Sequence, residues 1–354
     1  MKELQREELR PGMILGANVY NFRGQLLIAQ GAVLTDYIIA KLEYYCIRRV
    51  KVKDGELTEV EKRLSEATKR IRDSQEFKTF HVQYDSGVEM FRDSLNDIVE
   101  KSAEIDVDQM YDDMQRLISG GTGLNLFDMI QNLRQYDDST YAHAVNVGMI
   151  CNILAGWLDF SAEDIKTATM CGLLHDVGKV KIPSSIIKKP GKLTEEEFEI
   201  IKRHTIEGYQ ILREKKLDRS ICNAALMHHE KCDGSGYPFG LQSEQIDRYG
   251  KLVAVADIYD AMTSERVYRR ALSPFEVIQL FEDEGLYRYD ARYIMTFLQR
   301  VADTYLNERV RLNDGREGQI VYINRQQIAR PTIQCGDILV DLIKEKDLKI
   351  EQML

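Results

Sequence analysis

The stretch ATMCGLLHDVGKVKIP at residues 168–183 decides how this sequence is interpreted. Residues 168–174 are almost entirely apolar, and the pair His175-Asp176 follows them directly. Gly178 breaks the helix that the apolar run predicts. Two polar groups at the end of a buried helix need partners, because burying them unpaired costs several kcal/mol. The stretch therefore predicts a polar site inside an apolar helical core.

Further imidazole and carboxylate groups lie on apolar helix faces or at helix ends. His143 is in register with apolar residues of STYAHAVNVGMICNIL, and His204 lies on an isoleucine stripe of a helix expected over 194–214. His228 and His229 end a helix at 221–227, just before the loop DGSGYP at 233–238, and Asp257 faces the apolar side of KLVAVADIYDAM. Each residue taken singly is most simply a hydrogen-bonded core residue. Together they predict a metal site, because imidazole with carboxylate favours iron, manganese or zinc, and one aspartate can bridge two ions that act on a phosphate ester.

Composition narrows the class of protein. The chain has 354 residues, 44% of them hydrophobic and 30% charged, which is typical of one to three globular domains. A net charge of −9 argues against binding to a nucleic-acid polymer. No apolar run reaches the roughly 18 residues of a membrane span, and the opening MKELQREELR is too charged for a signal peptide. Six cysteines without a CxxC pair indicate a reducing compartment, so we expect a cytoplasmic protein.

Hydrophobic periodicity divides the chain into four segments. Residues 1–53 predict a small α+β module, with strands at 13–20 and 25–28 joined by a turn at 22–24, a helix at 34–46 and a closing strand at 48–52. Residues 54–122 predict an amphipathic helical connector, and its stripes at 55–117 favour a homodimer. Residues 123–306 are expected to be helical. Residues 307–354 predict a β-rich tail with a hairpin at 309–323 and a strand at 338–342, so the fold class is mainly α.

The motifs HDVGK at 175–179 and HHEKCDGSGYP at 228–238 resemble the HD-GYP family of the HD phosphohydrolase superfamily. The order of YxH at 141–143, His204, Asp257 and SERVYR at 264–269 also matches that family. The resemblance covers about 123–306, roughly half the chain. A bare HD pair is a weak signal, whereas HHExxDGxGYP is highly specific.

The resemblance implies an all-helical HD-type catalytic domain and a phosphoric diester hydrolase. Such enzymes hydrolyse cyclic di-GMP in bacteria to linear pGpG, GMP or both, by attack of a hydroxide that bridges two metal ions. The first ion would be held by four residues: His143, His175, Asp176 and Asp257. Asp176 would bridge to the second ion, held by His204, His228 and His229.

The same resemblance assigns the remaining roles. Asp176, Lys179 and His175 would be catalytic, with Lys179 neutralising charge on the phosphoryl oxygens. Lys179, Tyr237, Arg266 and Arg269 would contact the substrate. Iron and manganese suit these ligands comparably. We expect two ions rather than three, because Ser139 and Asp138 do not match the acidic residue that holds a third ion in some members.

Two other functions remain open. The chain could be an HD hydrolase that acts on another cyclic dinucleotide or nucleotide, or a non-catalytic module that binds cyclic di-GMP. The presence of every expected ligand and of Lys179 argues against the second. The module at 1–53 carries no nucleotide-binding or metal-binding motif, so it could dock protein partners, support the dimer or act as a sensor.

Overall fold

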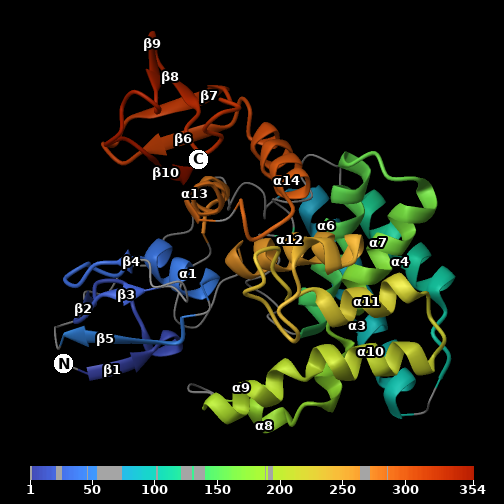
Figure 1. Ribbon diagram of the computed structural model, residues 1–354. Helices are drawn as coiled ribbons and strands as arrows, with labels where there is room; N and C mark the ends of the chain where they lie inside the picture. The colour runs from blue at the N-terminus through green and yellow to red at the C-terminus, as the bar shows by residue number, and fades with distance from the viewer. Residues whose placement is uncertain are drawn as a thin grey trace.

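The structure is a computed structural model, and it describes residues 2–20, 26–45, 47–53, 74–100, 103–120, 130, 140–187, 189, 194–263, 272–284 and 286–354. Helices dominate, which confirms the mainly α fold class (Figure 1). The described α-helices are α1 (Asp36–Tyr44), α3 (Gln75–Glu100), α4 (Val107–Gly120), α6 (Thr140–Trp157), α7 (Ala162–Leu174), α8 (Ser184–Ile187), α9 (Glu195–Lys202), α10 (His204–Glu214), α11 (Arg219–Met227), α12 (Arg248–Thr263), α13 (Pro274–Glu284) and α14 (Ala291–Thr304). The short 3-10 helices among the described residues are η1 (Arg6–Glu8), η2 (Val177–Lys181) and η3 (Ser243–Gln245).

The N-terminal module, residues 2–53, folds around α1. Its strands are β1 (Lys2–Gln5), β2 (Ile14–Leu15), β3 (Val19–Tyr20), β4 (Leu26–Ile28) and β5 (Arg49–Lys53). β5 is the centre of an antiparallel sheet ordered β1-β5-β2, while β3 pairs with β4. The sequence predicted β5 but not β1, and the turn expected at 22–24 lies outside the described residues. Leu9, Leu15 and Ile39 are fully buried here, because α1 covers the sheet with its apolar face.

The central helices are enclosed by other helices. α6 packs against α7, α12, α3 and α4, and α11 packs against α7, α10 and α12. α6 and α12 are buried over most of their circumference, which explains why their sequences are apolar on nearly every side. Polar side chains that project from these helices are therefore forced into the interior.

The helix expected over 194–214 is interrupted at Arg203, so that prediction was wrong in part. The predicted capping box is present, with Thr194 and Glu197 satisfying each other's backbone N–H groups before α9. At the interruption, His204 Nδ1 donates to the carbonyl of Ile201 at 2.6 Å, and the Thr205 hydroxyl donates to that of Lys202 at 3.0 Å. Side chains thus occupy carbonyls that a continuous helix would use for its backbone bonds. His204 becomes the first residue of α10.

The C-terminal residues form a five-stranded antiparallel sheet. Its strands are β6 (Arg309–Leu312), β7 (Glu317–Tyr322), β8 (Thr332–Cys335), β9 (Ile338–Asp341) and β10 (Ile350–Met353), in the order β10-β6-β7-β8-β9. The predicted hairpin and the strand at 338–342 are confirmed, whereas β8 and β10 were not expected. α13 lies between this sheet and the N-terminal module (Figure 1). Its Asp283 accepts a hydrogen bond from the Tyr37 hydroxyl of α1 at 2.8 Å.

None of the helices in the described part of the chain is long and apolar enough to cross a membrane.

Candidate metal centre and its surroundings

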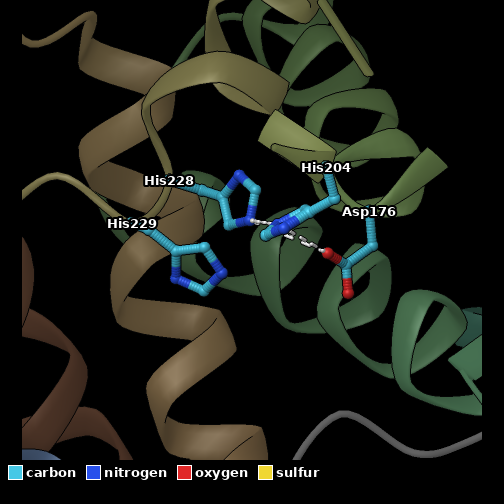
Figure 2. Close-up of side chains that lie close together, drawn as sticks. All are labelled: Asp176, His204, His228 and His229. Carbon is cyan, nitrogen blue, oxygen red and sulfur yellow. Dashed lines mark hydrogen bonds and ion pairs between the residues drawn. The ribbon is translucent and has the colours of Figure 1, made fainter. Parts of the chain in front are cut away.

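Six elements bring the seven predicted donor residues together. Within each of two groups, one potential ligand atom per residue lies within 4.8 Å of the others. The first group comes from η2, α10 and the end of α11 (Figure 2): Asp176, His204, His228 and His229. The second group comes from α6, the end of α7 and α12: His143, His175 and Asp257. We call these seven residues the donor cluster.

The Asp176 carboxylate stands between the two groups. Its Oδ1 lies 3.3 Å from His204 Nε2 and 3.8 Å from His228 Nε2. Its Oδ2 lies 3.3 Å from His175 Nε2 and 3.8 Å from His143 Nε2. The two oxygens of one buried carboxylate thus face opposite sets of imidazoles, which is the geometry that a bridging ligand requires.

Hydrogen bonds at the outer ring nitrogens orient the histidines. Nδ1 of His175 bonds to the Gly172 carbonyl at 2.7 Å, and Nδ1 of His228 bonds to the Ala225 carbonyl at 3.0 Å. His204 makes the equivalent bond with Ile201. A carbonyl oxygen can only accept, so Nδ1 carries the proton in each ring. In the neutral form of such a ring, Nε2 presents a lone pair to the cluster, the arrangement found in metal-ligating histidines.

The charge states of the cluster also favour a cation. Burial lowers the pKa of His228 and His229 well below the usual value and lowers that of His204, so these rings are neutral. Burial acts to raise the pKa of Asp176, but Lys179 and His175 outweigh it and hold that pKa well below its usual range. Neutral imidazoles around an ionised carboxylate are the protonation states in which these groups bind metal.

His143 differs from the other rings. Burial acts to lower its pKa, but hydrogen bonds to Asp257 and Asp260 outweigh burial and raise the pKa to about 9. Nε2 of His143 lies 3.1 Å from Asp257 Oδ1. A cation bound between these two residues would take the place of that proton.

The buried atoms of the cluster fit a metal ion. His175 is 1% exposed and Asp176 is 5% exposed. Within the described part of the chain, neither His175 Nε2 nor Asp176 Oδ1 has a hydrogen-bond partner. Leaving such atoms unsatisfied costs about 1–3 kcal/mol each, and a cation in each group would satisfy both.

Gly178 allows η2 to approach α10 closely enough to form the first group. A Cβ atom at this position would stand 1.9 Å from the His204 carbonyl oxygen and 2.4 Å from the Gly208 backbone nitrogen. Only a residue without a side chain fits. The glycine of the HDVGK stretch therefore fixes the distance between Asp176 and His204.

Comparisons with known proteins agree with this arrangement. The HD domain family model matches residues 127–293, which contain the whole donor cluster. This region is an HD domain. A cyclic di-GMP phosphodiesterase of Pseudomonas aeruginosa is 35% identical over 57% of this chain and 49% of its own. One of Thermotoga maritima is 33% identical over 68% of this chain and 66% of its own. A 3'3'-cGAMP-specific phosphodiesterase of Vibrio cholerae is 39% identical over 41% of this chain and 34% of its own. The chain thus spans between about one third and two thirds of these relatives.

The GYP loop, residues 233–238, covers one side of the donor cluster. The Tyr237 ring lies against His229, with ring centroids 4.6 Å apart and an interplanar angle of 32°. The Tyr237 backbone N–H donates to the His229 carbonyl at 3.2 Å. Tyr237 is therefore held beside the donor cluster, as a substrate-contacting residue would be.

The two glycines of the GYP loop shape the turn of the loop and its packing against its own start. Gly234 has φ +77°, which favours glycine in a turn. A Cβ atom at Gly236 would stand 2.4 Å from both Glu230 Cα and the Lys231 backbone nitrogen. These glycines let the loop fold back on its own start.

Two buried carboxylates were missed in the sequence. Asp260 is 2% exposed, and its Oδ2 accepts the Nδ1 proton of His143 at 2.8 Å. Glu230 is also 2% exposed and accepts the backbone N–H groups of Phe239 and Leu241 at 2.7 and 2.9 Å. Asp260 lies three residues after Asp257 on the same helix, and this spacing could have indicated that both carboxylates face the donor cluster. Nothing local indicated the partners of Glu230.

The remaining predicted site residues divide into two sets. Lys179 forms a short ion pair with Asp176 and thus adjoins the donor cluster. Arg266 and Arg269, predicted to contact substrate, lie outside the described residues, as do Asp138 and Ser139. The sixth histidine, His81, is on α3 and pairs with Asp85 at 3.4 Å, away from the donor cluster.

Proposed function

We propose that this chain is a metal-dependent phosphodiesterase that hydrolyses cyclic di-GMP to linear pGpG, GMP or both. The observation that carries the proposal is the Asp176 carboxylate, whose two oxygens face separate groups of histidines. The HD domain and its relatives supply the substrate class. Two of the three relatives described above are named as cyclic di-GMP phosphodiesterases.

The donor cluster would hold two divalent ions, iron or manganese. His143, His175 and Asp257 would hold one ion, and His204, His228 and His229 the other, with Asp176 shared between them. When bound, such ions would polarise a phosphodiester and lower the pKa of water.

The chain's own side chains would position the substrate. Lys179, next to Asp176, supplies positive charge where charge develops on the phosphoryl oxygens. Tyr237 offers an aromatic face beside His229 on which a guanine base could stack. Arg266 and Arg269 complete the proposed contacts with phosphate. The local cations explain how a chain with net charge −9 could bind an anionic dinucleotide.

A different cyclic dinucleotide is the second candidate substrate. The Vibrio cholerae relative, named as specific for 3'3'-cGAMP, is 39% identical over the segment it shares with this chain. The donor cluster would act on the phosphodiester groups, which both substrates contain. Only contacts with the bases would therefore distinguish cyclic di-GMP from 3'3'-cGAMP.

The decisive experiment is metal analysis of anaerobically purified protein, followed by turnover of cyclic di-GMP, 3'3'-cGAMP and guanosine tetraphosphate. We expect two ions per chain and fastest turnover of cyclic di-GMP. Asp176→Ala should lose both the second ion and activity, because one oxygen of Asp176 lies 3.3 Å from an imidazole of the first group and the other lies 3.3 Å from an imidazole of the second. His81→Ala is the matched control and should keep two ions. Protein without transition metal would refute the site, and metal without turnover would favour a binding module.

The oligomeric state, the protein partners and the cellular location of the chain stay predictions. We propose a homodimer through residues 55–117, supported by Val82 and Met90 on α3, which are 67% and 50% exposed. Residues 54–73 of this connector lie outside the described chain. Light scattering of the wild type and of Val82→Glu would test the interface, and a monomeric wild type would overturn it. We also propose that protein partners dock to the N-terminal module and that the protein is cytoplasmic.

A further inference from the structure

One buried arginine joins the N-terminal module to the GYP loop. Arg288 lies between α13 and α14 and is 2% exposed. Its Nη1 donates to the Tyr44 carbonyl at the end of α1 at 2.7 Å, and its Nη2 donates to Ser235 Oγ at 3.3 Å. A single guanidinium thus contacts residues that are far apart in the sequence.

The environment of Arg288 requires a guanidinium. The group stands 5.0 Å from the ring centroids of both Tyr44 and Tyr45, which is within range of a cation–π interaction. Its partner in α1 is a carbonyl at a helix C-terminus, where the helix dipole favours positive charge. Lysine could not present two fixed donors in different directions while lying between two aromatic faces.

The contact between Arg288 and Ser235 lies next to the part of the GYP loop that packs against the donor cluster. Ser235 Oγ also donates to Asp233 at 2.6 Å, and the Cys232 backbone N–H donates to the Arg288 carbonyl at 2.9 Å. Two residues after Ser235, Tyr237 lies against the ring of His229. The guanidinium and the carbonyl of Arg288 thus hold the segment that places Tyr237.

A second contact between the same two parts supports this role. The guanidinium of Arg48, the residue just before β5, stands over the ring of Phe198 in α9. Phe198 in turn packs edge-on against Tyr237, with ring centroids 6.0 Å apart. Two separate routes from the N-terminal module therefore end within the same three residues of the GYP loop.

We infer that Arg288 is a positioning residue, which uses the end of α1 as a fixed point to hold the GYP loop and Tyr237 over the donor cluster. The inference rests on the proposed function only where it predicts how Arg288 affects substrate binding. The N-terminal module is, on this view, a structural part of the substrate site.

The test compares full-length wild type with Arg288→Met and Ser235→Ala, all purified anaerobically with their metal. In Arg288→Met we expect amide hydrogen exchange in residues 232–237 to rise on the order of tenfold, since a bond to a charged group is lost. KM for cyclic di-GMP should rise by a similar factor while kcat changes less, because Arg288 touches no metal donor. Metal content should stay at the wild-type value. Ser235→Ala should shift exchange and KM in the same direction, and it tests the contact even if Arg288→Met does not fold.

Conservative variants and a matched control separate positioning from general stability. Ser235→Thr keeps the hydroxyl and should restore wild-type exchange and KM. The effects of the two changes in the double variant should be less than additive, because both remove the shared contact between Arg288 and Ser235. Arg330→Met is the control, since Arg330 donates to the carbonyls of Leu342 and Leu348 in the C-terminal part; it should leave the loop unaffected.

Unchanged exchange in residues 232–237, or additive effects in the double variant, would overturn the inference. If the wild type fails to turn over cyclic di-GMP, the proposed function fails, and the exchange measurements still decide the role of Arg288.

Discussion

Replacing Gly178 by alanine should remove one metal ion and destabilise the HD domain. The added Cβ would stand 1.9 Å from the His204 carbonyl oxygen, whereas Cβ contacts under 3.0 Å essentially do not occur, so the two backbones must separate by about 1.1 Å. Asp176 and His204 lie on opposite sides of this contact. A metal site tolerates changes of only about 0.2 Å in its ligand distances, so the first donor group would lose its geometry.

The size of the effect follows from the cost of overpacking. Inserting a methyl group into a filled interior costs about 1–3 kcal/mol. If metal binding is weakened by that amount of free energy, the affinity for the metal ion drops by about 5- to 150-fold. Metal content after anaerobic purification should fall from two ions towards one, and manganese titration should give the change in affinity.

Gly156→Ala is the matched control for this prediction. Gly156 lies near the end of α6, and nothing stands within 4 Å of a Cβ added there. Alanine is better than glycine in a helix by about 0.5–1 kcal/mol, so this variant should keep both ions and unfold at a slightly higher temperature. Wild-type metal content and unfolding temperature in Gly178→Ala would refute the reasoning about the donor geometry.

Two further predictions concern the carboxylates that support the site. Asp260→Asn should weaken metal binding at His143 by about 10-fold or more, because removing such a supporting partner typically has this effect; calorimetric titration showing unchanged affinity would contradict it. Glu230→Gln should leave one of the Phe239 and Leu241 N–H groups facing an NH₂ group, at a cost of about 1–3 kcal/mol. Limited proteolysis should then cut residues 236–241 faster, and an unchanged cleavage rate would count against this role of Glu230.

Much of the secondary structure was readable from local patterns. Helical periodicity predicted α6, α11 and α12 and placed His143 and Asp257 on their apolar sides. The capping box at Thr194 was predicted because it depends on residues only three apart. The break at Arg203 was not, since it arises where the His204 and Thr205 side chains take backbone carbonyls. Strands β1, β8 and β10 were missed because short strands depend on partners elsewhere in the chain.

The sequence by itself determined which residues belong to the donor cluster, because a histidine or aspartate on an apolar helix face must point inward, and its motifs indicated the HD-GYP family. The tertiary structure decided how these residues are arranged. It directed the two oxygens of Asp176 towards different histidines, set Asp260 behind His143, and joined Tyr44 to Ser235 through Arg288, 244 residues beyond Tyr44. Such contacts join helices and loops that are distant in sequence, and local periodicity carries no information about which of them meet.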